Sequence, residues 1–136
     1  MSKKNKFTIV IFISLLLVIL GIIKFTFNSG YKIHIVNNTN QSIKSIEIKF
    51  KVGSILETIS QIDPSSSWKT TIDTNSIQGE NSIVLIYKDN QGNSYEKTIV
   101  GYLEKGYSGK VKVFIDKIDE NGKLEINTKW IDKKYG

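Results

Sequence analysis

The sequence predicts an all-β domain that follows a single N-terminal transmembrane helix. Residues 7–23 carry no charged side chain, whereas much of the remaining chain alternates apolar and polar residues with the period of a β-strand. The chain also contains no alanine, the best helix former, and is rich in isoleucine, which favours sheets. These three observations set the fold class, and each predicted element is justified below.

The apolar segment is long enough to cross a membrane. As a helix rising ~1.5 Å per residue, residues 7–27 match the ~30 Å hydrocarbon core, with Lys24 free to snorkel to the headgroups. Lys3, Lys4 and Lys6 precede it without an acid, and a basic flank stays cytoplasmic. We therefore expect a cytoplasmic tail over residues 1–6, a signal-anchor helix over 7–27, a linker over 28–30 and an extracytoplasmic domain over 31–136.

A cleaved secretory signal is the alternative interpretation of this segment. Such signals have a shorter apolar stretch of about 7–15 residues and small residues just before the cut. Here Phe27 and Asn28 occupy the positions where small residues are needed. We therefore expect an uncleaved anchor, with secretion of the domain as the alternative. Because the chain has no cysteine, a lipoprotein anchor is excluded and no disulfide stabilises the domain.

The net charge of +6 does not indicate a nucleic-acid partner. Lys3, Lys4, Lys6 and Lys24 carry four of these charges, and the signs are interspersed in the rest of the chain, as on an ordinary solvated surface. Every basic residue is lysine, so the usual bidentate reader of phosphates and bases is missing. Abundant lysine, asparagine and isoleucine without alanine or arginine are typical of an AT-rich bacterial genome.

Short alternating segments with turns between them fill residues 31–136. The clearest is Ile46–Phe50, where apolar side chains alternate with Glu47 and Lys49. This pattern is typical of an antiparallel Ig-like β-sandwich of about seven or eight strands. A transthyretin-like sandwich or a small barrel fits as well, because alternation does not reveal strand order. The other expected strands are residues 31–36, 55–62, 68–72, 83–87, 95–100, 111–115 and 124–130.

One stretch of this pattern resembles a known family. It consists of Ile-Val-Asn-Asn-Thr at residues 35–39, the apolar positions Ile43, Ile46, Ile48 and Phe50, then Ile62-Asp63-Pro64 and Ser67-Trp68. Together these residues resemble the opening half of bacterial extracytoplasmic Ig-like modules of the CARDB and FxLYD kind, over residues 31–72. Ser65 stands where such modules usually have glycine. The resemblance implies an adhesion, scaffold or sensing module without a catalytic centre, and it transfers no binding residue.

The sequence offers no catalytic, metal or cofactor site. Triads and common zinc sites need histidine or cysteine, and the chain has one histidine and no cysteine. We expect that histidine, His34, at the surface because it is out of phase with its apolar neighbours. Residues 119–122 resemble a calcium loop, but aligning Gly122 places Lys117 and Thr128 at ligand positions. We therefore expect a hairpin turn there, no cofactor and no enzymatic activity.

Residues 101–109, GYLEKGYSG, are the best candidate for a binding segment. Tyr102, Leu103 and Tyr107 lie between glycines and form a candidate interaction loop, since tyrosine is favoured at interfaces. The alternative, which we favour, is a crossover with an inward tyrosine whose hydroxyl bonds to the backbone. Trp68 and Trp130 are in phase with apolar neighbours, so we expect both in the core.

These inferences lead to an expected function without a named ligand. We expect a single-pass protein of the cell membrane, N-terminus inside, whose outer domain acts as a scaffold, sensor or envelope-complex subunit through protein–protein contacts. Because the linker over residues 28–30 reaches only about 10 Å, we expect the bilayer itself and a protein close to it as partners. An immunity-type protein that neutralises an incoming toxin is the alternative. A hydrolase would need two converging carboxylates.

Overall fold

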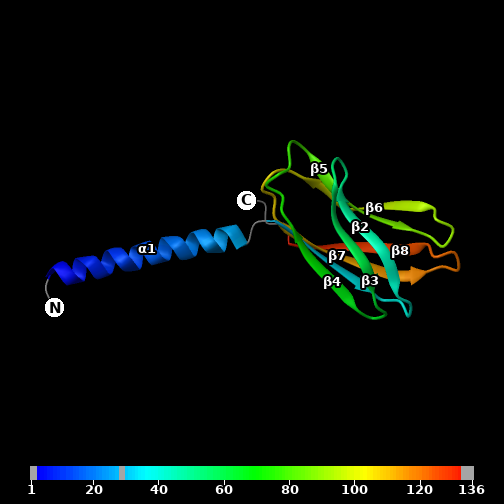
Figure 1. Ribbon diagram of the computed structural model, residues 1–136, viewed down its shortest axis with the longest axis horizontal. Helices are drawn as coiled ribbons and strands as arrows, with labels where there is room; N and C mark the ends of the chain where they lie inside the picture. The colour runs from blue at the N-terminus through cyan, green and yellow to red at the C-terminus, as the bar shows by residue number, and fades with distance from the viewer. Residues whose placement is uncertain (1–2, 28–29, 133–136) are drawn as a thin grey trace.

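The computed structural model describes residues 3–27 and 30–132, with side chains over 3–24 and 30–131, as one helix and eight strands (Figure 1). The helix, α1, covers Lys3–Phe27. The strands are β1 (Tyr31–Asn37), β2 (Ile43–Phe50), β3 (Ile55–Ile62), β4 (Ser67–Ile72), β5 (Asn81–Lys88), β6 (Ser94–Leu103), β7 (Gly109–Ile118) and β8 (Leu124–Asp132). Every strand that the alternation predicts is present.

The helix α1 is long and apolar enough to span a membrane. Within Lys3–Lys24, an 18-residue stretch has a mean hydropathy of 2.8 and is not buried by the rest of the protein. It begins at Lys3 and so includes part of the expected tail, where the Thr8 hydroxyl donates a hydrogen bond to the Lys4 carbonyl. A helix that is apolar on all sides and exposed requires an apolar environment.

The eight strands form two four-stranded sheets that pack as a sandwich. The strand order is β4-β1-β7-β8 in sheet A and β3-β2-β5-β6 in sheet B. β1 and β7 pair in parallel, and every other pair is antiparallel. In an immunoglobulin constant-type domain the first two strands share a sheet, whereas here β1 and β2 lie in different sheets. The β-sandwich is confirmed, but its Ig-like order is not.

The core lies between the sheets and is almost entirely aliphatic. Ile33 and Ile35 of β1 stand beside Val111 and Val113 of β7, and all four are fully buried. In sheet B the central strand β5 is buried on its inner side and largely covered on its outer side, where Val84 is also inaccessible. This explains its unbroken apolar sequence.

The two ends of the sandwich differ, and we name them by the start of β1. The proximal end contains Tyr31, its register partners Ile72 and Gly109, and the loops 73–80 and 104–108. The distal end contains the β5–β6 and β7–β8 turns, which lie together in Figure 1. There the Asn90 N–H donates to the Asn121 carbonyl at 2.9 Å, so one backbone hydrogen bond joins the two sheets.

The two tryptophans lie at opposite ends of the sandwich. Trp68 pairs with Ile35 near the start of β4 and packs against the core, as predicted. Trp130, opposite Val111, is 50% exposed, so the prediction of a buried side chain is wrong. The reason is that β8 is an edge strand of sheet A and Trp130 lies near its end. A side chain near the end of an edge strand has neighbours on fewer sides, even when the alternation directs it towards the core.

Candidate functional site

The segment between β6 and β7 displays the two tyrosines that the sequence singles out. The loop itself is residues 104–108, between the end of β6 at Leu103 and the start of β7 at Gly109. The rings of Tyr102 and Tyr107 lie edge to face with centroids 5.9 Å apart. They are 47% and 39% exposed. Both rings stand on the surface, so the expectation of an inward-packed tyrosine is wrong.

Leu103 does not belong to this surface, which corrects its place in the candidate interaction loop. β6 continues three residues beyond its expected end, and register shifts in its pairing with β5 interrupt the alternation, so that Tyr102 is exposed and Leu103 is buried. Leu103 is fully buried in the core, opposite Asn81 of β5. It fixes the end of the strand and leaves the two tyrosines as the accessible side chains.

A buried threonine in the loop 73–80 holds the tyrosine loop in place. The Thr74 hydroxyl donates to the Tyr107 carbonyl at 2.6 Å, and the Thr74 carbonyl accepts from the Gly106 N–H at 3.2 Å. Thr74 is fully buried, and the nearby Ile77 anchors its loop in the core. Gly106 has a φ of 78°, which glycine adopts without strain. The loop 104–108 is therefore held in place by its hydrogen bonds to the buried Thr74.

The Tyr102 hydroxyl faces the Glu104 carboxylate, to which it donates a hydrogen bond. This bond raises the pKa of Tyr102 strongly, and desolvation raises it further. The phenol therefore stays protonated near neutral pH. The side chain presents an apolar ring with a polar tip, a combination suited to a surface between apolar and aqueous surroundings.

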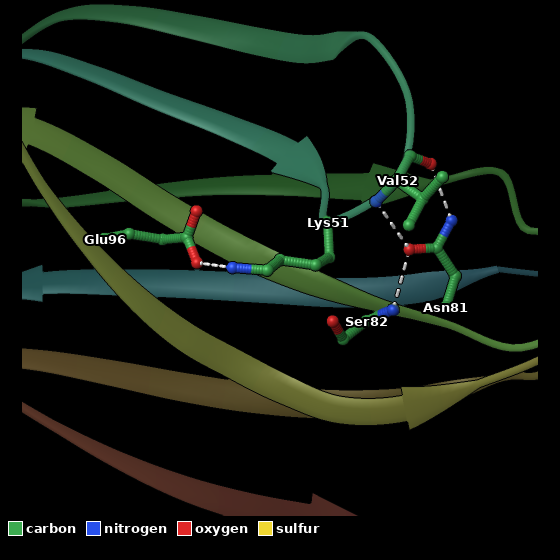
Figure 2. A network of polar contacts seen from close by, with 5 residues as sticks. All are labelled: Lys51, Val52, Asn81, Ser82 and Glu96. Atoms are coloured by element: carbon green, nitrogen blue, oxygen red, sulfur yellow. Dashed lines mark hydrogen bonds and ion pairs between the residues drawn. The ribbon is translucent and has the colours of Figure 1, made fainter.

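A polar network fixes the β2–β3 turn at residues 51–54 (Figure 2). Asn81 Oδ1 accepts from the N–H groups of Val52 and Ser82 at 3.2 and 2.9 Å, and Asn81 Nδ2 donates to the Val52 carbonyl at 2.9 Å. Lys51 forms an ion pair with Glu96 on β6. With its backbone held this way, the Val52 side chain points away from the sandwich and is 75% exposed.

The outer face of sheet A carries a group of lysines that we call the lysine face. In register, His34 lies between Lys69 of β4 and Lys112 of β7. No carboxylate among the described side chains forms an ion pair with a lysine of this group. Beside it on the same face, the half-buried Val36 and Phe114 pair in register. The lysine face consists of Lys32, Lys69, Lys110, Lys112 and Lys129.

His34 is half-buried within the lysine face and not fully at the surface as expected. Its Nε2 atom is inaccessible and has no hydrogen-bond partner among the described residues. Desolvation lowers the pKa of His34, and the charges of Lys69, Lys112 and Lys110 lower it further. The imidazole is therefore neutral at pH 7, and its surroundings disfavour its protonation.

In each of the two acidic turns at the distal end, an aspartate carboxylate accepts hydrogen bonds from backbone N–H groups of the same turn. Asp89 Oδ1 accepts from the N–H groups of Gln91 and Asn93 at 2.9 and 2.8 Å. Asp119 Oδ1 accepts from the N–H groups of Asn121 and Lys123 at 2.9 Å each. The segment that resembles a calcium loop is therefore a hairpin turn, as predicted, and its aspartate oxygen caps the turn.

Neither a ligand cluster nor a deep pocket marks a site for chemistry in the described part of the chain. Within residues 3–27 and 30–132, no three His, Cys, Asp or Glu residues form a group able to hold a metal ion. An open hollow of about 390 Å³ lies beside the β7–β8 hairpin, where Lys117 and Glu125 form an ion pair at 3.5 Å. The surfaces, and not a pocket, are the features that distinguish the domain.

Sequence reasoning missed the lysine face because it depends on strand order. Lys32 and His34 alternate with core residues in one strand, and Lys110 and Lys112 do so in another. This period-two pattern shows that each strand has a basic outer side. It does not show that β1 and β7 are neighbours, so charges that are interspersed along the sequence gather on one face of the structure.

Comparisons with known proteins give no family for this chain. No family model and no curated protein matches the sequence. A solved structure, described as an NMR structure of a protein from Eubacterium rectale, is similar with a TM-score of 0.46 and 14% identity. The similarity covers 80% of this chain and 94% of that one. The resemblance of residues 31–72 to CARDB and FxLYD modules remains a prediction.

Proposed function

We propose that this protein is a membrane-anchored binding module whose sandwich lies on the outer face of the cell membrane. The observation that carries the proposal is the exposed helical segment Lys3–Lys24, uncharged over residues 7–23, which comes directly before a folded domain. Lys3, Lys4 and Lys6 at its start, with no acid in the first turn, favour an inside N-terminus.

The lysine face supports a protein partner with an acidic surface. The five lysines, which form no ion pair with any described side chain, lie on one face of a sheet and repel one another, and an opposing acidic surface relieves this repulsion. The adjacent pair Val36 and Phe114 adds apolar contact area. Charge complementarity of this kind steers association and selects the partner, while the apolar contact contributes affinity. A scaffold, sensor or envelope-complex subunit acts through such a contact.

The strand order supports a transthyretin-like sandwich over the Ig-like alternative. The first strand lies between the fourth and the seventh and pairs with the seventh in parallel. We therefore propose the transthyretin-like class for this sandwich, an alternative that the alternation left open. Neither class brings a catalytic centre with it, because function resides in sites and not in folds.

The anchor and its direction are tested with single cysteines, because the natural chain has none. Gln91, exposed at the distal end, and Ser2 serve as the two positions. On intact cells, a membrane-impermeant maleimide should label Gln91→Cys, and it should label Ser2→Cys only after the membrane is permeabilised. Labelling of Ser2→Cys but not of Gln91→Cys on intact cells would contradict the proposed orientation of the helix. A soluble product that has lost Ser2 supports the secreted alternative.

The lysine face is tested by photo-crosslinking in the cell that produces the protein. A photoreactive amino acid at Val36 should give one crosslinked product of defined mass. The product should disappear when Lys69 and Lys112 are both changed to Glu. Lys44→Glu with Lys49→Glu on sheet B is the matched control of equal charge change and should leave it intact. Equal loss in both double variants would show a general charge effect and contradict a specific surface.

A further inference from the structure

The exposed large apolar side chains of the sandwich gather at one end. Within residues 30–131 the structure has six such residues that are more than a third exposed. Two are the tyrosines of the β6–β7 segment, two belong to the end of β8, one lies in the β2–β3 turn and one directly follows that turn. They are Val52, Ile55, Tyr102, Tyr107, Trp130 and Ile131.

All six lie at the proximal end. Trp130 is opposite Val111, two residues from Gly109, which pairs with the first residue of β1. Tyr107 belongs to the loop directly before Gly109, and Tyr102 to the end of β6. The β2–β3 turn joins the same end through the hydrogen bonds of Asn81, whose register partner is Leu103 (Figure 2).

The distal end carries none of these residues. Its four turns consist of asparagine, aspartate, glutamine, serine and other polar residues, together with one proline and two glycines. Where large apolar side chains approach these turns, as at Tyr95 and Leu124, they are partly buried against the core. The sandwich therefore has an apolar end and a polar end, and a surface of single scattered apolar residues does not produce such a division.

The apolar end is also the end closest to the helix in the covalent chain. The helix α1 ends at Phe27, and Gly30 is already buried in the sandwich. A Cβ atom at Gly30 would lie 2.7 Å from the Ile72 carbonyl oxygen, so the backbone is closely packed there. Three residue steps span at most about 10 Å. If the helix crosses the bilayer, this end cannot leave its surface.

We propose that the proximal end of the sandwich docks into the interface of the bilayer, with Tyr102, Tyr107 and Trp130 at the level of the headgroups. This inference rests on the proposed membrane anchor. Tyrosine and tryptophan are enriched at this level because each side chain combines an apolar ring with a polar O–H or N–H group. The protonated Tyr102 hydroxyl suits that position.

The contact is apolar and does not require anionic lipid. Asp73, Glu80 and Glu104 accompany Lys51 and Lys105 at this end, so charges of both signs lie around the aromatic side chains. We therefore expect docking on vesicles of zwitterionic phosphatidylcholine and at high salt. Docking fixes the tilt of the sandwich, and the lysine face on its side then stays accessible to a protein partner.

Tryptophan quenching in the full chain tests the proposal, because the helix contains no tryptophan. The protein is reconstituted into phosphatidylcholine vesicles with or without lipids brominated near the headgroup. In the variant Trp68→Phe, which retains Trp130, brominated lipid should reduce the emission at least about twofold, as expected for an interfacial side chain. In the matched variant Trp130→Phe, the emission of Trp68 at the distal end should be unchanged.

The outcomes separate this inference from the membrane anchor. Protein that does not float with the vesicles contradicts the anchor. Protein that floats but keeps full Trp130 emission contradicts the docking alone. Quenching that disappears in about 1 M salt, where the screening length is about 3 Å, contradicts an apolar contact. If Trp68→Phe does not fold, the difference between the natural chain and Trp130→Phe gives the Trp130 signal.

Discussion

The buried side chains of Asn37 and Thr39 are hydrogen-bonded to each other, with the Thr39 hydroxyl 2.7 Å from Asn37 Oδ1. The other end of the amide, Asn37 Nδ2, lies 2.8 Å from the Gln41 carbonyl, 3.1 Å from that of Ile62 and 3.0 Å from that of Asp63. β1 belongs to sheet A and β3 to sheet B. One asparagine therefore links the two sheets through the interior.

Replacing this asparagine should strongly destabilise the domain. Asn37→Ala removes the acceptor of the buried Thr39 N–H and the amide donor to the carbonyls of Ile62 and Asp63, so we expect the free energy of unfolding to fall by about 2–4 kcal/mol. Asn40→Ala is the matched control, because Asn40 is exposed in the same turn, and it should change stability by less than about 0.5 kcal/mol. Urea unfolding followed by circular dichroism measures both. Similar values for the two variants contradict a structural role of Asn37.

A close contact between Tyr31 and Gly109 sets the start of the parallel β1–β7 pair. A Cβ atom at Gly109 would lie 2.7 Å from a carbon of the Tyr31 ring. Gly109→Ala should therefore lower the free energy of unfolding by about 1–3 kcal/mol. Gly101→Ala is the control, since nothing lies within 4 Å of its Cβ position. Thermal unfolding that shows no difference between the two contradicts the contact.

The sequence predicts the strands better than their arrangement. Residues 55–62 form a strand with the predicted bounds, because alternation and flanking turns are local properties. The position of β1 between β4 and β7 depends on contacts between distant segments, which local patterns do not contain. For the same reason the lysine face could not be predicted, and the end position of Trp130 could not be distinguished from a core position.

The tyrosines show a second limit of sequence reasoning. Tyr102 and Tyr107 are correctly singled out, but their exposure depends on where β6 ends. The strand continues to Leu103, and the register shifts in its pairing with β5 decide which neighbour is buried. A difference of three residues at a strand end, within the usual error of boundaries predicted from sequence, therefore changes the list of accessible side chains.

The corner at residues 63–66 should become more stable with glycine. Ser65 has a φ of 58°, and the Ser66 N–H donates to the Asp63 carbonyl at 3.2 Å. With Pro64 before it, Ser65 occupies the turn position that usually requires glycine. Ser65→Gly should raise the free energy of unfolding by about 0.5–1 kcal/mol, because relief of strain exceeds the added backbone entropy. Ser66→Gly is the control and should not gain stability in this way. An equal change in the free energy of unfolding for both variants would contradict backbone strain at Ser65.

Stability should fall on mild acidification because of His34. Its folded-state pKa lies below 6.5, the value for a free side chain, so the unfolded chain binds a proton at higher pH than the folded chain. The contribution of the neutral imidazole is complete well above pH 6.5 and is lost as the pH falls below 6.5 and through the lowered pKa of the folded state. His34→Asn should remove this loss of stability below pH 6.5. Asp89 and Asp116, whose pKa values are lowered from 3.8, affect stability only in more acidic solution.

The hydroxyl of Thr74 should determine whether the tyrosine pair is presented as a fixed surface. Thr74→Val keeps the shape of the side chain but leaves the Tyr107 carbonyl without its 2.6 Å donor. We expect a loss of about 1–2 kcal/mol in stability and faster hydrogen exchange at residues 104–108, while amides in the centre of β5 keep their protection. Thr71→Val, at an exposed position of β4, is the matched control and should change neither. Unaltered exchange in Thr74→Val would mean that Gly106 and the strand ends alone hold the loop. Faster exchange together with weaker lipid quenching of Trp130 would show that the fixed loop is part of the docking surface.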